Sequence, residues 1–275
     1  MNILNSRKLI ALGLILVLAL AFTGCSGSNQ AKKKPTVKLG YVQWASAEAS
    51  THIVKEVLER AGYKVETPIL QFAAMYQGTA NKELDGFVCA WLPNTDKEYW
   101  EKYGDKLVDL GANYDSAKIG IVVPEYVEVD SLASLKKHAD KFNKRIVGID
   151  PGATEMQIVR NKTMPAYDLK EWNLKASSGP AMATTLGKAI KDKKWIAVTG
   201  WKPHWKWAKW DLKFLKDPKK TMGKGEYIKS IGRPGIKEDL PKVAEFLSNY
   251  KLTTKQLGNV MLKIQGDVKP KKAAE

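Results

Sequence analysis

Apolar positions along this chain follow two alternating patterns, one typical of buried strands and one typical of amphipathic helices. Residues 86–91 form a continuous apolar run, as expected for a strand buried on both faces. Residues 46–61 instead place Ile53 and Val57 on one stripe at helical spacing. The expected strands are 37–42, 63–70, 86–91, 107–110, 119–123, 145–149, 174–176 and 195–199. The expected helices are 46–61, 72–81, 95–102, 132–139, 156–161, 181–190, 238–248 and 253–264.

This alternation predicts an α/β protein with mostly parallel sheets built from strand–helix–strand units and flanked by helices. The elements form two series, which indicates a two-lobed binding protein. We expect lobe one to comprise residues 36–115 plus 218–265, and lobe two residues 116–217. The chain would cross between lobes near 114–119 and return near 217–233, with a Gly/Pro-rich link at 223–235 before the closing helices and a polar tail at 266–275.

The N-terminal segment indicates export. Arg7 and Lys8 precede the apolar run Ile10–Phe22, which is short for a membrane span and is placed like the core of a signal peptide. The sequence Phe-Thr-Gly-Cys ending at Cys25 resembles a bacterial lipobox. We therefore expect residues 1–24 to be a lipoprotein signal peptide and Cys25 to carry the lipid; an uncleaved membrane anchor is the alternative.

Residues 25–35 are polar and rich in Gly, Ser and Lys, which favours a flexible tether. With Cys25 lipidated, Cys89 is the only other cysteine, so no disulfide can form within one chain. The expected location is the extracytoplasmic face of a bacterial cell membrane.

The formal charge of +16 raises the question of nucleic-acid binding. The lysines are spread along the chain rather than clustered, and an exported protein seldom meets nucleic acid, so we expect no such partner. Trp and Lys also alternate through 201–213, a pattern that can stack bases or lie in a bilayer interface. Pro203 interrupts this stretch, and we expect its later tryptophans to pack under the lobe.

Three tryptophans follow predicted strands: Trp44, Trp91 and Trp201. Ligands of open α/β sheets bind beyond the carboxyl ends of the strands. Several tryptophan rings gathered there predict an aromatic box for a quaternary ammonium group, held by cation–π attraction.

Nothing in the sequence indicates catalysis. The histidines are His52, His138 and His204, none at a metal-binding spacing, and no nucleophile elbow or phosphate-binding loop is present. We expect no enzyme activity, no metal and no cofactor. His204 lies three residues after Trp201, where it can orient the nearby tryptophans or contact a ligand.

Four segments carry a family resemblance. They are Gly40-Tyr-Val-Gln-Trp44 with Glu48-Ala-Ser-Thr-His52, Ala90-Trp-Leu-Pro-Asn-Thr95, Gly148-Ile-Asp-Pro-Gly152, and Thr199-Gly-Trp-Lys-Pro-His-Trp205. Over residues 36–265 the chain resembles the substrate-binding lipoprotein of a glycine betaine (betaine/proline-type) ABC importer. The resemblance implies a two-lobed periplasmic-binding-protein-like fold, an ABC permease as membrane partner and a quaternary ammonium osmolyte as ligand.

The resemblance also implies roles for individual residues. Trp44, Trp91 and Trp201 would surround the trimethylammonium head of glycine betaine. Backbone N–H groups after the Pro-Gly turn, at Thr154 and Glu155, would hold its carboxylate, as suits a helix N-terminus.

Asp96 departs from the family pattern, which has a carboxylate-binding His at this position. A carboxylate about 4 Å from another costs about 4 kcal/mol at an effective dielectric of about 20. Asp96 would therefore turn away, stay protonated, or mark a substrate without a carboxylate, such as choline. The remaining alternative is that Asp96 caps the helix that begins near Lys97.

Overall fold

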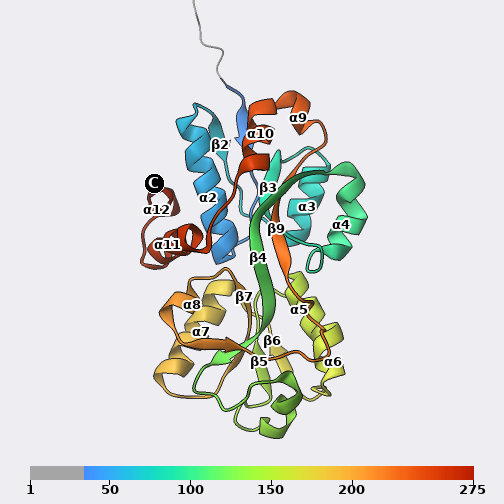
Figure 1. The fold of residues 1–275 in the computed structure, drawn as a ribbon, viewed down its shortest axis with the longest axis vertical. Helices are drawn as coiled ribbons and strands as arrows, with labels where there is room; N and C mark the ends of the chain where they lie inside the picture. The colour runs from blue at the N-terminus through green and yellow to red at the C-terminus, as the bar shows by residue number, and fades with distance from the viewer. Residues whose placement is uncertain (1–33) are drawn as a thin grey trace, which may run out of the picture. The chain divides into compact units, whose positions relative to one another are not determined.

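The computed structural model describes residues 34–275, so the expected signal peptide, Cys25 and most of the expected tether lie outside the described residues. Thr36–Glu275 forms one compact unit in which two α/β lobes are joined by long strands (Figure 1). No helix within residues 34–275 is long and apolar enough to cross a membrane.

The sheet of lobe one is built outward from β3 (Gly86–Leu92), whose seven residues are all buried. β3 pairs antiparallel with β9 (Glu226–Gly232), and β9 pairs with the first half of β4 (Val108–Pro124). On the other side, Leu39 bridges to Gly86 and thereby joins β3 to the parallel pair β1 (Thr36–Lys38) and β2 (Lys64–Glu66).

The second half of β4 belongs to the sheet of lobe two. There it pairs antiparallel with β7 (Ala197–Lys202) and with β8 (Leu212–Phe214). β5 (Arg145–Val147) lies between β7 and β6 (Asn173–Lys175) and is parallel to both. One strand, β4, therefore runs through both lobes (Figure 1).

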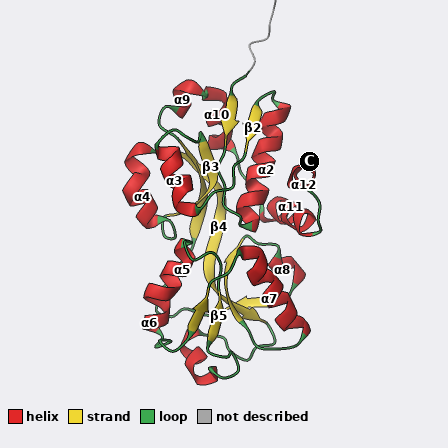
Figure 2. Cartoon of the chain, turned by 180° about the vertical axis from the view of Figure 1, so that it is seen from behind, coloured by secondary structure: helices red, strands yellow, loops and turns green. Residues whose placement is uncertain are grey.

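Helices cover both faces of these sheets, as the view from behind shows (Figure 2). In lobe one they are α2 (Ala45–Arg60), α3 (Phe72–Ala80), α4 (Lys97–Tyr103), η1 (Gly104–Lys106), α9 (Ile236–Asp239) and α10 (Pro241–Asn249). In lobe two they are η2 (Leu132–His138), α5 (Thr154–Ile158), η3 (Val159–Thr163), α6 (Met164–Ala166), α7 (Gly179–Lys191) and α8 (Lys206–Lys209). The C-terminal helices α11 (Thr254–Gln265) and α12 (Pro270–Ala274) both pack against α2.

Local signals explain several of these elements. α2 buries Val54 and Leu58, while Lys55 and Glu59, one turn apart, form an ion pair with their charged atoms 2.9 Å apart. α11 begins with a capping box in which Thr253 and Gln256 bond to each other's backbone N–H.

The structure differs from the sequence predictions in several places. The sheets are mixed rather than mostly parallel, because the strands that connect the lobes run antiparallel to their neighbours. The separately expected strands 107–110 and 119–123 are parts of the single strand β4, so the predicted crossing near 114–119 falls inside it. The expected link at 223–235 contains β9, and the expected polar tail at 266–275 contains α12.

Two apolar clusters lie on opposite faces of the lobe-one sheet, and a larger one fills lobe two and extends to Trp91. Cys89 belongs to lobe one's inner core, with its Sγ 3.7 Å from Met75 Sδ. Burial raises the pKa of the Cys89 thiol, so this thiol stays protonated and unreactive.

Candidate functional site

The three tryptophans expected to form a box do converge on one cavity, at the junction of the two lobes. Trp91 lies near the end of β3 and Trp201 near the end of β7, whereas Trp44 is the residue that caps the N-terminus of α2. The cavity is lined by Trp44, Trp91, Thr95, Ile119, Ile149, Ala153, Glu155 and Trp201. We call this set the Trp cage.

The arrangement of the rings suits a cation, although the cavity between them is only about 20 Å³ and must widen to admit a group larger than a water molecule. The ring centroids of Trp44 and Trp201 lie 6.5 Å apart with their planes inclined by 54°. A single cation can therefore lie within about 6 Å of both rings, the range in which cation–π attraction operates. Trp44 stacks on Phe72 with centroids 5.4 Å apart, which fixes the ring from behind.

The strand that joins the lobes contributes to the wall of the cage. Ile119 of β4 pairs in register with Trp201 of β7, and both line the cavity. Ile149 and Ala153 add apolar surface from the loop between β5 and α5. The sequence pattern does not mark these three residues or Thr95 as site residues, although each lies within a few positions of a predicted strand or helix end.

Glu226, another residue missed from the sequence, fastens the turn after Trp91 to β9. Its Oε2 accepts hydrogen bonds from the Thr95 backbone N–H at 2.8 Å and from that of Asn94 at 3.3 Å. Its Oε1 accepts from the Thr95 hydroxyl. Both the backbone and the hydroxyl of Thr95 are thereby bound to β9.

Of the sequence-based alternatives for Asp96, the structure agrees with a side chain that turns away from the cage and not with a helix cap. The side chain is fully buried but does not line the cage, and it makes no capping hydrogen bond although Asp96 stands at the N-cap of α4. Instead its Oδ2 accepts from the Trp91 backbone N–H at 2.7 Å and from the Tyr76 hydroxyl at 3.0 Å. Burial raises the pKa of Asp96 well above its usual range, against the effect of these two donors. Asp96 therefore supports Trp91 from behind.

Glu155 is one of the residues that line the cage, and its carboxylate is bound to backbone N–H groups, whereas the sequence had suggested a role only for its own backbone N–H. Glu155 Oε1 accepts from the Gly200 N–H at 3.0 Å. Burial raises the pKa of Glu155 above its usual range, and the nearby ammonium of Lys206 opposes that rise. The neighbouring Thr154 is buried at the start of α5 but does not line the cavity.

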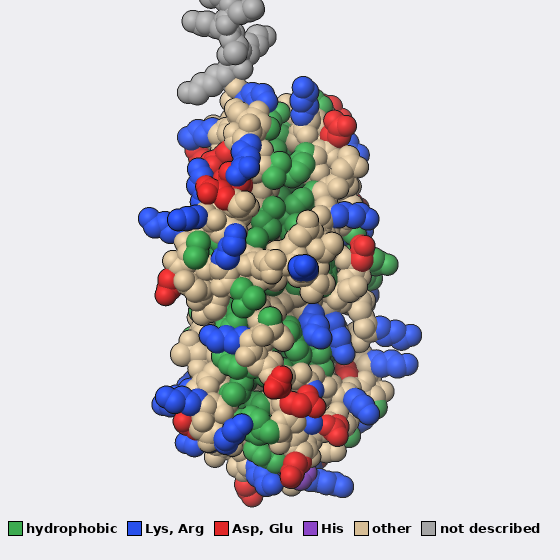
Figure 3. Space-filling view, turned by 60° about the vertical axis from the view of Figure 1, so that its left-hand side comes forward, with side chains coloured by type: hydrophobic (Ala, Val, Ile, Leu, Met, Phe, Trp, Pro, Cys, Tyr) green, Lys and Arg blue, Asp and Glu red, His purple; other side chains and the backbone are tan. Residues whose placement is uncertain are grey.

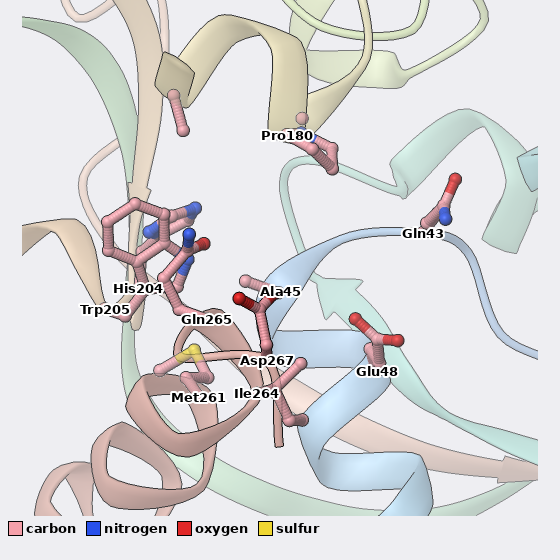
Figure 4. A pocket seen from close by; sticks show the side chains of 12 residues that line it. Gln43, Ala45, Glu48, Pro180, His204, Trp205, Met261, Ile264, Gln265 and Asp267 are labelled. Carbon is pink, nitrogen blue, oxygen red and sulfur yellow. The ribbon is translucent and has the colours of Figure 1, made fainter. Parts of the chain in front are cut away.

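A larger inter-lobe pocket adjoins the Trp cage and contains His204 (Figure 4). Its wall comes from the start of α2, the start of α7, the segment after β7, and the C-terminal end of α11 with the turn that follows. The lining residues are Gln43, Ala45, Glu48, Gly179, Pro180, Ala183, His204, Trp205, Met261, Ile264, Gln265 and Asp267. Gly179 connects the two cavities, since a Cβ added there would lie 4.0 Å from the Trp201 ring.

His204 is neutral and can donate a hydrogen bond into this pocket. Burial, followed by the charge of Lys206, lowers the pKa of His204 well below its usual range. Its Nδ1 accepts from the Lys206 backbone N–H at 3.0 Å, so the single proton is assigned to Nε2. Its ring also meets Trp201 edge-on, with centroids 4.9 Å apart. Both roles considered from the sequence, orienting Trp201 and contacting a ligand, are compatible with this position.

Other expectations concern the surroundings of the site. Trp205 is buried, while Trp207 and Trp210 are half-buried, and the Trp207 Nε1–H donates to the Trp201 carbonyl at 2.8 Å. Lysines are scattered over the face drawn in Figure 3 rather than gathered in one patch. Within the described part of the chain, no group of three or more acidic, His or Cys side chains could hold a metal ion.

A mixed α/β fold of two lobes with an aromatic cage at their junction is typical of two-lobed ligand-binding proteins. A family model described as the substrate-binding domain of ABC-type glycine betaine transport systems matches residues 35–275. The chain belongs to this family, which is a family of transport proteins and not of enzymes.

Individual relatives agree with this assignment. The chain is 43% identical over 141 residues to the glycine betaine/carnitine transport binding protein GbuC of Listeria monocytogenes; the match covers 51% of this chain and 47% of GbuC, about half of the relative's length. Lactococcal OpuAC, crystallised closed with glycine betaine, is 43% identical, with a TM-score of 0.83 over 88% of this chain and 94% of that one. A choline-binding protein in complex with choline is 25% identical, with a TM-score of 0.81 over 87% and 86%.

Proposed function

We propose that this protein is the extracytoplasmic receptor of an ABC importer and captures glycine betaine or a similar quaternary ammonium osmolyte between its lobes. The observation that carries the proposal is the convergence of Trp44, Trp91 and Trp201 on one buried cavity. Three desolvated cation–π contacts of about 1–2 kcal/mol each supply a large part of the roughly 8 kcal/mol that micromolar binding needs.

The polar end of the ligand is expected to extend from the cage toward the adjoining pocket. There the Nε2–H of His204 is available as a donor to a carboxylate or a hydroxyl. The other candidate position for the ligand carboxylate is at the backbone N–H groups of Thr154 and Glu155. It is less suited to a carboxylate because Glu155, an acidic residue, already lines the cage.

Choline is the second candidate ligand. The acidic side chain of Glu155 in the cage favours a ligand with a net positive charge, and the similar choline-binding protein shows that this fold can hold choline. Asp96, which had been the reason to consider choline, no longer supports it because its side chain does not line the cage.

The remaining features of this role are part of the same proposal. Residues 1–24 would be a lipoprotein signal peptide, Cys25 the lipid anchor and 25–35 a tether to the membrane, where an ABC permease would receive the ligand. The lobe boundaries, 36–115 plus 218–265 and 116–217, are proposed on the same basis.

A panel of ligand titrations followed by intrinsic tryptophan fluorescence tests the proposal. Glycine betaine, carnitine, proline betaine and choline should include at least one ligand that binds with micromolar or better affinity. Proline, without methyl groups on nitrogen, should bind far more weakly. Failure of every quaternary ammonium compound to bind would overturn the proposed function.

A further inference from the structure

Two buried side chains of opposite charge lie beside the Trp cage. Glu155 is 4% exposed and lines the cavity. Lys206, on α8, is 0% exposed, and its Nζ lies 4.6 Å from the centroid of the Trp201 ring. Lys206 is not among the residues that line the cage, so its ammonium covers the ring from outside the cavity.

The carboxylate of Glu155 and the ammonium of Lys206 both lie next to Gly200, the residue before Trp201. Glu155 accepts the Gly200 N–H, while a Cβ added at Gly200 would lie 2.8 Å from Lys206 Nζ. A side chain at this position would have to displace the ammonium. Lys206 Nζ has no hydrogen-bond partner among the described residues, so the Trp201 ring and the carboxylate of Glu155 provide its electrostatic compensation.

A quaternary ammonium group in the cage would compete with Lys206 for the same two partners. It would lie against the cavity side of the Trp201 ring and close to the carboxylate of Glu155. Positive charge on one side of an aromatic ring weakens the attraction of its other side for a second cation. The ligand and Lys206 therefore compete for the electrostatic attraction of the Trp201 ring and of Glu155, although they occupy different positions.

We propose, on the basis of the proposed function, that Glu155 is the counter-ion of the bound quaternary ammonium group and that Lys206 sets how strongly the cage prefers a cation. The cage thereby discriminates by charge as well as by shape. Without Glu155 its preference for a cation over an uncharged group of the same size would be smaller.

The other ionisable groups nearby are committed elsewhere or are neutral. Both oxygens of Glu226 accept hydrogen bonds from the turn after Trp91, and Asp96 lies behind Trp91. His204 is uncharged. Glu155 is the only acidic side chain that lines the cage in the described part of the chain.

A pair of isosteric ligands isolates the effect of charge. Glycine betaine and 3,3-dimethylbutanoate have the same shape and the same carboxylate, but the second has carbon in place of the quaternary nitrogen. The ratio of their dissociation constants cancels effects on packing and on the carboxylate. We would measure this ratio by calorimetry for the full mature chain and its variants at pH 7.5.

The variants are Glu155→Gln and Lys206→Met, with Lys209→Met as the matched control. Lys209 lies on the same helix, also near aromatic rings, but is exposed. Glu155→Gln should reduce the preference for glycine betaine about tenfold, and Lys206→Met should increase it severalfold. Lys209→Met should leave it unchanged.

Equal changes for both ligands in Glu155→Gln and Lys206→Met would show that the two residues act only through packing, and would overturn the inference. If a variant does not fold, a pH series on the unaltered protein replaces it. Burial raises the pKa of Glu155 and lowers that of Lys206, while the charge of each group opposes the shift of the other. As pH rises from 6 to 9 the pair becomes more negative, so the preference should increase, and a flat profile would contradict the proposal. No glycine betaine binding by the unaltered protein would overturn the proposed function instead.

Discussion

Each tryptophan of the cage is held by a different partner, which keeps the three rings in place at the junction of the lobes. Phe72 stacks behind Trp44, Asp96 holds the backbone of Trp91, and Trp207 donates to the carbonyl of Trp201. Preorganised rings lose little conformational freedom when a ligand binds, so more of the interaction energy appears as affinity.

Replacing any cage tryptophan with leucine should weaken binding of a quaternary ammonium ligand by about 1–2 kcal/mol, roughly tenfold. Leucine keeps apolar area but loses the ring quadrupole that attracts the cation. Affinities from calorimetry would test this for Trp44, Trp91 and Trp201. Trp195, which packs against Phe142 in lobe two, is the matched control and should tolerate leucine without loss of affinity. Unaltered binding by all three cage variants would exclude the cage as the binding site.

Asp96 should affect stability rather than ligand choice. Asp96→Asn keeps an oxygen to accept from Trp91 and Tyr76, so the ratio of glycine betaine to choline affinity should stay unchanged. Asp96→Ala leaves the Trp91 N–H without its acceptor and should cost about 1–3 kcal/mol of stability.

The pH dependence of stability should also reveal Asp96. Because its pKa is raised in the folded state, the folded state holds this proton more tightly, and the corresponding stability is lost as pH rises above the unfolded value toward the folded one. Urea unfolding at pH 5 and pH 8 should therefore show a smaller decline in Asp96→Asn than in the unaltered protein. A changed ligand ratio in Asp96→Asn would place this side chain in the cage after all.

At the scale of elements, strands such as β3 were predictable because an uninterrupted apolar run indicates burial on both faces. The continuity of β4 was not, because Gly111 and polar residues such as Asn113 break its apolar pattern where it passes between lobes. The strand β9 was not predictable because Gly and Pro residues flank it in the sequence. Glu226 and Lys206 escaped notice because a single charged residue normally indicates exposure, and only tertiary structure shows that these two are buried.

Glu226 gives a test of how β9 controls the site. Glu226→Ala removes the acceptor for both backbone N–H groups of the turn and for the Thr95 hydroxyl, and should lower stability by about 2–3 kcal/mol. Ligand affinity should fall as well, because Thr95 lines the cage. Glu226→Gln retains an oxygen for the backbone donors and should be milder in both respects. Equal effects of the two substitutions, measured by urea unfolding and ligand titration, would argue against this anchoring role.

For the whole molecule, the position of the cage links binding to the arrangement of the lobes. Trp44 and Trp91 come from lobe one and Trp201 from lobe two, so a ligand that contacts all three favours the conformation in which they are together. The strands β4 and β9 connect the two lobes, so a movement of one lobe relative to the other must change the shape of these strands.

Saturating ligand should therefore reduce the radius of gyration in small-angle scattering and raise the melting temperature. At a ligand concentration of 100 times the dissociation constant, the stabilisation should be about 2.7 kcal/mol. The Trp201→Leu variant at the same ligand concentration is the control and should show smaller changes. Scattering and melting that stay constant with every quaternary ammonium ligand would contradict a closing receptor.

The inert thiol of Cys89 makes this movement accessible to optical measurement. Its Sγ is enclosed against Met75 and its raised pKa keeps it protonated, so thiol-reactive dyes should not modify it in the folded protein. Cys25 is the only other cysteine, and a chain that begins after it needs no further cysteine removal. One cysteine introduced on α10 and one on η2 could then carry a donor and an acceptor fluorophore, and energy transfer between them would report how often single molecules open and close.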